Sequence, residues 1–466
     1  MTSEKKINSF RIEKDSIGEI KVPREKYWGA QTQRSLENFK IGLDKIPSEF
    51  IQAFAIQKKA AAISNIALNR LESKLGNKII QVCDQIISGK LLDQFPLSVW
   101  QTGSGTQTNM NLNEVIANKA NESLGKSLGN YDPIHPNDHC NLGQSSNDSF
   151  PTVMHISIVL ETKKNLLPSI EKLSRTLKKK VNHFEKIIKI GRTHMQDATP
   201  LTLGQEFNAY FGQIENAKKR ISESINSLLY LAQGGTAVGT GLNSSNKFAA
   251  GFVKATQMIT EMPFKESKNK FEQLSSHEAI IHFSGSLNTL VIACYKIAND
   301  IRLLASGPRC GIGEISLPAN EPGSSIMPGK INPTQCEAMT QVCLYVMGLN
   351  SSNSVAGTQG HFQLNAYKTL IIFNTLTSIR LMSDVMESFS TKCLEGIIAN
   401  KSVIDKNLKN SLMLVTALNP KIGYTKASEV AKKAYKENIT LKEAVVKLGY
   451  LNEKEFDLIV DVKKMI

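Results

Sequence analysis

Residues 280–304 read IIHFSGSLNTLVIACYKIANDIRLL, and this stretch indicates a mainly α fold. Its apolar residues recur in steps of three and four over three heptads, which is the spacing of a helix seam. The seam consists of Phe283, Leu287, Leu290, Cys294, Ile297, Ile301 and Leu304. Further apolar residues such as Ile281, Val291 and Ala298 widen it, so the helix buries more than one face. We therefore expect a long helix inside a bundle that extends across subunits.

The same reasoning predicts further helices elsewhere in the chain. They cover residues 48–75 with Gly76 as the stop, 151–185 with a bend near Pro168, 201–232, 333–347 and 361–388. Strand patterns are short and fall mainly in the first forty residues. We expect a mainly α protein with an N-terminal mixed, mostly helical domain at 1–140, a central helical-bundle domain at 141–394 and a small C-terminal helical domain at 395–466.

Composition and charge exclude several classes of protein. The chain has 466 residues, of which 41% are hydrophobic, so it is too long for one ordinary core and too apolar for a disordered chain. No apolar run approaches the roughly 18 residues that cross a bilayer. The start, MTSEKKINSF, lacks the apolar segment of a signal peptide. We expect a cytoplasmic protein with no membrane partner.

The charge balance is basic, since 56 Lys and Arg minus 42 Asp and Glu give +14. The lysines are spread along the chain, and runs such as Lys178–Lys180 lie on amphipathic helical stretches. This pattern favours solvated helix faces over a nucleic-acid site, which requires clustered cations. The seven cysteines form no CxxC pair, which argues against a disulfide framework and against a cysteine zinc site.

The most informative loop is GSSIMPGKINP at residues 323–333. Its prolines and glycines forbid a regular helix, after which Pro333 suits a first helical position, Asn332 its cap and Gln335 a capping box. A phosphate-binding P-loop is rejected because five residues separate Gly323 from Gly329. Helix capping leaves two serines and one lysine unexplained, namely Ser324, Ser325 and Lys330. Two hydroxyls and a cation beside a helix N-terminus suit a carboxylate or another anion.

Other polar segments admit simpler structural interpretations. Ser145–Asp148 is explained as the cap of the helix near Pro151, and 102–113 as a turn followed by a helix. His135 and His139 invite a zinc hypothesis, but Pro136 works against the helical turn that would align them. The glycines of 234–241 lack the GxGxxG order, so we expect no dinucleotide site.

The loop GSSIMPGKINP resembles the signature loop of the fumarase/aspartase superfamily. Further segments are similar to motifs of that superfamily: TGSGTQTNMN at 102–111, HPND at 135–138, QSSND at 144–148, GRTHMQDATP at 191–200 and GGTAVGTGLN at 234–243. The similarity covers nearly the whole chain. His194 and the continuation Thr334-Gln335-Cys336-Glu337 resemble class II fumarases rather than aspartases.

The resemblance implies an architecture and a reaction. The fold is the three-domain fumarase/aspartase fold, with a central five-helix bundle that forms a twenty-helix core in a homotetramer. Each active site draws residues from three subunits. The reaction is the reversible addition of water to fumarate, giving L-malate through an aci-carboxylate intermediate, a hydro-lyase step of the citric acid cycle. No metal and no cofactor are expected.

The resemblance also implies residue roles. Ser324 is the base for the carbon-bound proton, His194 acts on the water, and Glu337 orients His194. Lys330 and Asn332 bind a substrate carboxylate. The remaining substrate-binding residues are Ser104, Gly105, Thr106, Ser145, Ser146, Asn147, Thr193 and Ser325.

A second dicarboxylate site is implied at His135, Pro136, Asn137 and Asp138, although the neighbouring Cys140, Leu142 and Gly143 depart from the family's commoner residues.

Two alternatives to a fumarase stay open at the level of the sequence. One is an ammonia-lyase that acts on aspartate, against which His194 and the TQCE continuation weigh. The other is a scaffold that has kept the bundle and lost activity, against which the intact Ser324, Lys330 and Glu337 weigh.

Overall fold

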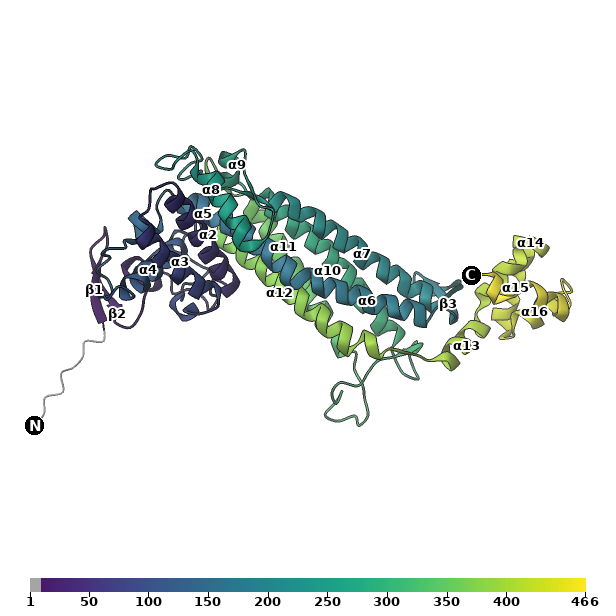
Figure 1. Cartoon of the computed structure of the whole chain (residues 1–466). Helices are drawn as coiled ribbons and strands as arrows, with labels where there is room; N and C mark the ends of the chain where they lie inside the picture. The colour runs from purple at the N-terminus through teal and green to yellow at the C-terminus, as the bar shows by residue number, and fades with distance from the viewer. Residues whose placement is uncertain (1–9) are drawn as a thin grey trace, which may run out of the picture. The chain divides into compact units, whose positions relative to one another are not determined.

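The computed structural model describes residues 10–466, and the chain is mainly helical, as the periodicity predicts (Figure 1). It divides into two compact units that the chain enters more than once. Unit 1 consists of the residues up to Leu167, Lys219–Thr289 and Tyr345–Leu381. Unit 2 consists of Pro168–Lys218, Leu290–Leu344 and Met382–Ile466. The three domains expected from the sequence remain a prediction.

Unit 1 begins with an antiparallel hairpin of β1 (Phe10–Lys14) and β2 (Glu19–Pro23), in the region where strands were expected. Its helices are α1 (Ala30–Asn38), α2 (Ser48–Ala67), α3 (Ser73–Ile87), α4 (Thr106–Glu122), α5 (Ser146–Glu161), α8 (Phe248–Thr260) and α9 (Lys270–Ser275). Short strand pairs complete it: β5 (Tyr230–Leu231) with β6 (Lys265–Glu266), and β8 (Gly360–His361) with β9 (Leu364–Asn365). Helix α2 is buried almost all round, and its Phe50 ring packs 4.8 Å from the ring of Phe150 in α5.

Five long helices form the predicted bundle and lie side by side (Figure 1). They are α6 (Leu167–His183), α7 (Leu203–Leu228), α10 (Glu278–Leu304), α11 (Thr334–Gly357) and α12 (Lys368–Lys392). Hydrogen bonds join neighbours, such as Tyr210 Oη of α7 to Asp300 of α10 at 3.0 Å, and Asn353 Nδ2 of α11 to Thr375 of α12 at 3.1 Å. The helix predicted from the 280–304 seam is α10, and every residue of that seam is buried.

The long helices α7, α10, α11 and α12 contribute to both units, and unit 2 also contains shorter elements. They are β3 (Ile188–Thr193), β4 (Gln196–Thr202), β7 (Ile315–Ser316), β10 (Ile398–Ala399), α13 (Lys401–Asn410), α14 (Asn419–Ile422), α15 (Tyr424–Glu437), α16 (Leu441–Lys447) and α17 (Glu453–Ile459). The C-terminal helices surround their own apolar cluster, which includes Leu418, Val430 and Val445.

Several predicted boundaries were wrong. The helix expected over 48–75 ends at Ala67, because Asn69 takes a left-handed conformation with φ 55° and the chain turns into α3. Gly76 does not stop a helix but lies inside α3, where a Cβ would come within 2.5 Å of the Ile66 side chain. Helix α11 runs to Gly357, and α12 begins only at Lys368. Strands β3 and β4 form an antiparallel hairpin well beyond the first forty residues, where strands were mainly expected.

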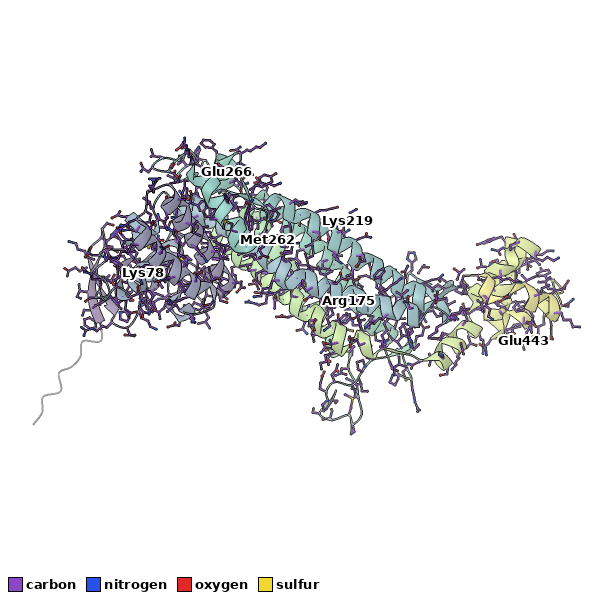
Figure 2. All side chains as sticks on the ribbon, viewed as in Figure 1. Lys78, Arg175, Lys219, Met262, Glu266 and Glu443 are labelled. Atoms are coloured by element: carbon purple, nitrogen blue, oxygen red, sulfur yellow. The ribbon has the colours of Figure 1, made fainter. Side chains whose placement is uncertain are left out.

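Helix α10 is the one helix in residues 10–466 with the length and composition to cross a membrane. Its most apolar window has a mean hydropathy of 1.2, and 56% of that window is buried within the protein. A core helix passes the same test, so this observation is weak evidence for a membrane span. The cationic residues are distributed over many elements (Figure 2): Lys78 lies on α3, Arg175 on α6 and Lys219 on α7.

Candidate active site

The segment at 102–106 forms a tight turn into α4. Gly105, at the helix N-cap, has φ 78°, and a Cβ there would lie 2.1 Å from the Phe150 ring, so only glycine fits. The hydroxyl oxygens of Ser104 and Thr106 are 3.0 Å apart, and Thr102 Oγ1 lies 3.4 Å from Ser104 Oγ. The turn therefore groups three hydroxyls at the start of a helix.

The segment at 144–148 is a helix cap as well as a candidate binding segment. Ser145 and Asp148 form a capping box on α5: Ser145 Oγ accepts from the Asn147 N–H at 3.1 Å, and the Ser145 N–H donates to Asp148 at 2.9 Å. Helix α5 therefore starts at Ser146, five residues before the Pro151 start that the sequence predicted. The simpler interpretation of Ser145–Asp148 as a cap is confirmed.

The structure brings these two segments together inside unit 1. Asn109 of α4 donates through Nδ2 to Ser146 Oγ at 3.0 Å and to Asn141 Oδ1 at 3.2 Å. The side chains of Ser104, Thr106, Ser146 and Asn147 are partly accessible at the surface of this cluster. Hydroxyl and amide donors are thus gathered in one place, which suits a carboxylate.

Two buried lysines lie beneath the cluster, and sequence reasoning missed both. Lys58 of α2 donates to Asn141 Oδ1 and to Gln144 Oε1, each at 3.0 Å, while Lys368 of α12 contacts the carbonyl oxygen of Asn147 at 3.3 Å. Burial lowers the pKa of each of these lysines to about 7. A sequence signal existed for Lys58, which stands four residues after Phe54 and four before Ala62 in an otherwise apolar stripe.

Hydrogen bonds join the two ends of the loop 323–332 in unit 2. The Gly323 N–H donates to the Lys330 carbonyl at 3.0 Å, and Asn332 Nδ2 donates to the Gly323 carbonyl at 2.6 Å. Asn332 therefore does not cap α11 as predicted, and the Gln335 side chain accepts from Ser388 instead of closing a capping box. Asn332 instead holds the two ends of the loop together.

Within this loop, the Ser324 hydroxyl oxygen accepts main-chain hydrogen bonds. Its Oγ accepts two backbone N–H groups, from Ile326 at 3.2 Å and from Met327 at 3.0 Å. A hollow of about 480 Å³ is lined by Ser324 and Lys330 among others. Two N–H donors aimed at one hydroxyl oxygen stabilise negative charge on that oxygen.

His194 lies at the tip of the β3–β4 hairpin. His194 and Met195 take left-handed conformations, with φ 55° and 62°, that reverse the chain. The hairpin is anchored by Arg192, whose guanidinium contacts both carboxylate oxygens of Glu314 at 2.7 and 3.1 Å. Burial raises the pKa of Glu314, but its hydrogen bond to Arg192 and the charge of Lys189 outweigh burial and hold that pKa below its ordinary value. The anchor of the hairpin is thus an ionised carboxylate.

The predicted catalytic side chains are not joined to one another within the described chain. Thr193, His194, Lys330 and Glu337 are all exposed. In residues 10–466, no hydrogen bond connects the side chains of Ser324, His194 and Glu337. The orientation of His194 by Glu337 therefore remains a prediction.

The predicted second site, His135–Asp138, forms a single π-helical turn over Pro136–Cys140. This turn forms although Pro136 was expected to oppose it, because proline stands at its first position, where no N–H is needed. His139 Nδ1 accepts from the His135 N–H at 2.9 Å, and His135 Nδ1 accepts from the Asn137 and Asp138 N–H groups at 3.3 Å. Within residues 10–466, no group of three His, Cys, Asp or Glu side chains is arranged to hold a metal ion.

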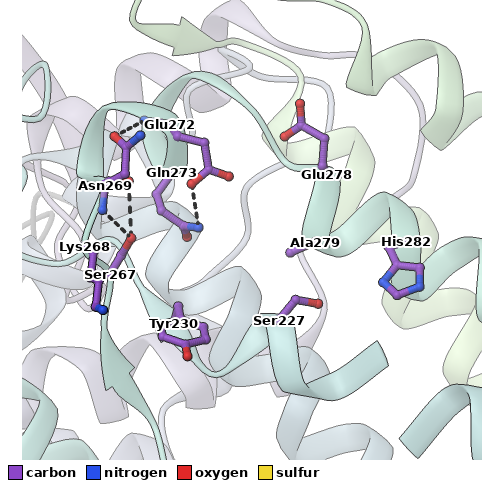
Figure 3. Close-up of a pocket in the computed structure, with 10 residues that line it drawn as sticks. All are labelled: Ser227, Tyr230, Ser267, Lys268, Asn269, Glu272, Gln273, Glu278, Ala279 and His282. Carbon is purple, nitrogen blue, oxygen red and sulfur yellow. Dashed lines mark hydrogen bonds between the residues drawn. The ribbon is translucent and has the colours of Figure 1, made fainter. Parts of the chain in front are cut away.

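A further pocket, of about 590 Å³, contains none of the predicted site residues (Figure 3). It lies in unit 1, between the end of α7, the segment around α9 and the start of α10. Glu272 and Glu278 both line it, together with Tyr230, Lys268 and His282. Two carboxylates repel a dianion, so this pocket is a poor site for a dicarboxylate.

Comparisons with known proteins agree over nearly the whole chain. The family model described as Lyase matches residues 18–348, and the one described as Fumarase C C-terminus matches residues 414–466. The class II fumarate hydratase of Rickettsia felis is 56% identical over 99% of this chain and 100% of its own length. The mitochondrial fumarate hydratase of Saccharomyces cerevisiae is 56% identical over 97% of this chain and 92% of its own. The crystal structure of recombinant class II fumarase from Schistosoma mansoni superimposes with a TM-score of 0.96 at 43% identity, and covers 98% of this chain and 99% of that one.

Proposed function

The chain belongs to the class II fumarate hydratases, and from this membership we propose how it hydrates fumarate reversibly to L-malate. The reaction is that of a hydro-lyase. In the dehydration direction, a proton leaves a carbon next to a carboxylate, and negative charge builds up on the carboxylate oxygens of the aci-carboxylate. The site must therefore supply a base, fixed donors for the growing charge, and an acid for the departing hydroxyl.

Ser324 is the base that removes the carbon-bound proton. The observation that carries this assignment is the pair of N–H groups, from Ile326 and Met327, that its Oγ accepts. An unassisted serine hydroxyl is a poor base, but donors that favour the alkoxide lower the cost of ionising it. Lys330, on the same loop, adds a positive charge and binds a substrate carboxylate together with Asn332.

His194 handles the water that is added or removed, and Glu337 orients its ring and stabilises its positive charge. The second carboxylate end of the substrate is held by the hydroxyls and amides of unit 1. These donors come from Ser104, Gly105, Thr106, Ser145, Ser146 and Asn147, assisted by Thr193 and Ser325. His135, Pro136, Asn137 and Asp138 form a separate dicarboxylate site that takes no part in the chemical step.

The active enzyme is a cytoplasmic homotetramer whose sites are each completed by three subunits. Two observations support this proposal. The catalytic side chains His194, Lys330 and Glu337 are exposed in the single chain. The bundle helices also expose large apolar side chains, for example Ile292 on α10 at 53%, and Leu344 and Val355 on α11 at 58% and 62%. Apolar faces of this kind are covered when bundles associate.

The proposal is tested with purified protein and L-malate in the presence of a chelator, following the ultraviolet absorbance of fumarate. We expect rapid product formation without added metal or cofactor. His194→Asn should lower kcat by at least about 100-fold while the protein stays tetrameric. His183→Asn, at an exposed histidine near the end of α6, is the matched control and should retain wild-type activity.

A tetrameric protein that forms no fumarate would overturn the proposal. Ammonia release from L-aspartate would then identify the ammonia-lyase alternative, and inactivity on both substrates would leave the scaffold alternative. Near-normal turnover in His194→Asn would remove that residue from the mechanism.

A further inference from the structure

Pro151 creates a local defect in α5 at the candidate binding segment. In a regular helix, the N–H of residue 151 donates to the carbonyl oxygen of Asn147. Proline has no N–H, so that carbonyl loses its helical partner. The carbonyl is instead contacted by the Lys368 ammonium at 3.3 Å. A side chain from α12 thus takes the place of a missing main-chain donor of α5.

Lys368 also contacts the other binding segment of unit 1. Its main-chain N–H donates to the Gly103 carbonyl at 2.9 Å, immediately before Ser104. The approach is very close, because a Cβ on Gly103 would lie 1.4 Å from the carbonyl oxygen of Ala366. One residue therefore joins the 102–106 turn through its main chain and the start of α5 through its side chain.

The surroundings of the Lys368 ammonium hold it in this place. Its side chain is fully buried, and this burial lowers its pKa to about 7, a shift that the nearby Asp148 opposes. Neighbouring His277 is buried too, and burial together with the charge of Lys368 holds the pKa of its ring well below the ordinary value. His277 therefore adds no positive charge beside Lys368, and the contact of the Lys368 Nζ with the Asn147 carbonyl shows that the side chain points to the N-terminal end of α5.

We propose that Lys368 is a positioning residue for the dicarboxylate-binding cluster, which it holds by replacing the N–H that Pro151 lacks and by fixing Gly103. This inference rests on the proposed function, because Ser104, Thr106, Ser146 and Asn147 are there assigned to substrate binding. Lys368 itself does not touch the substrate. Its removal lets Asn147 and the end of α5 shift away from the geometry that binds a carboxylate.

The test uses a rescue that only this role explains. Lys368→Met should lower kcat/KM for L-malate by roughly 10- to 100-fold, mainly through a higher KM, since a charge-assisted hydrogen bond is lost. Pro151→Ala restores an N–H facing Asn147 and should by itself stay within about 3-fold of wild type. The double variant Lys368→Met/Pro151→Ala should regain about 10-fold or more of the kcat/KM that Lys368→Met loses.

A double variant no more active than Lys368→Met would overturn the proposal. The proposal attributes the loss in Lys368→Met to an Asn147 carbonyl left without a donor, and the N–H that Pro151→Ala restores supplies that donor. A Lys368→Met enzyme within about 3-fold of wild type would overturn it as well. If Lys368→Met does not fold, Lys368→Gln with and without Pro151→Ala makes the same comparison. Wild-type protein without activity would instead contradict the proposed function, so the two failures are distinguishable.

Discussion

The two adjacent serines of the loop differ in what their hydroxyl oxygens contact. Ser324 Oγ accepts two main-chain N–H groups, whereas Ser325 is exposed and makes no hydrogen bond to any of residues 10–466. Only Ser324 therefore has donors in place to stabilise an alkoxide. This difference supports the proposal that Ser324 rather than Ser325 is the base.

Substituting each serine separately tests the assignment. Ser324→Ala should lower kcat by about 100-fold or more and change KM little, because it removes a group that acts in the transition state. Ser325→Ala should chiefly raise KM and keep most of kcat. Steady-state kinetics on L-malate measure both. A Ser325→Ala variant with kcat as low as that of Ser324→Ala would contradict the assignment.

Helix α5 begins at the candidate binding segment and carries a buried histidine further along. Its N-terminus carries the Ser145 cap, and one face carries His155, which is buried and whose Nδ1 lies 2.9 Å from the Tyr230 carbonyl. Burial lowers the pKa of His155 to about 4, so its ring stays neutral in the folded protein across most of the acidic range.

This predicts a specific pH dependence of stability. Between about pH 6.5 and pH 4, the unfolded chain binds a proton at His155 that the native chain does not bind. Stability is therefore fully present above pH 6.5 and decreases as the pH falls, by up to about 3 kcal/mol for each chain. In urea unfolding at pH 7.5 and pH 5.0, His155→Gln should lose less stability on acidification than wild type. His361→Gln is the control, because His361 also contacts a backbone carbonyl but is exposed. Equal losses in wild type and His155→Gln would contradict the prediction.

Each active site of the proposed tetramer draws its residues from several subunits, and mixing inactive variants tests this. Ser324→Ala and His194→Asn are each expected to be inactive as pure tetramers. If different subunits contribute these two residues, equal mixing should produce some sites with both wild-type side chains. Dissociating the two variants together in urea and reassociating them should then restore about a quarter of the activity that wild type regains in the same procedure.

The control for this experiment mixes Ser324→Ala with Lys330→Met. Both lesions lie in one loop of one chain, so mixing should restore nothing. No recovery in the first mixture, with reassembled tetramers present, would place Ser324 and His194 of one site in the same subunit. Recovery in the control mixture would mean that reassembly does not report on shared sites.

Features encoded over a few neighbouring residues could be predicted from the sequence. The 280–304 seam predicted a long buried helix because its period matches a helix face, and α10 has that form. The candidate loop at 323–332 was identifiable because its prolines and glycines exclude a helix while its serines and lysine have no structural explanation. The family, and with it the reaction, followed from the same motifs and is confirmed by full-length relatives.

The sequence does not reveal which polar groups become hydrogen-bond partners across the fold, because packing between distant segments selects them. Local spacing does not specify the contacts on which three features depend. These features are the 188–202 hairpin, the hydrogen bond from Asn332 to Gly323, and the separation of α2 from α3. The pairing of Lys368 with the carbonyl that Pro151 leaves free is the sharpest case. A sequence reveals that a proline lacks an N–H, but the donor that replaces it is selected by packing between distant helices, where a buried polar group must find a partner.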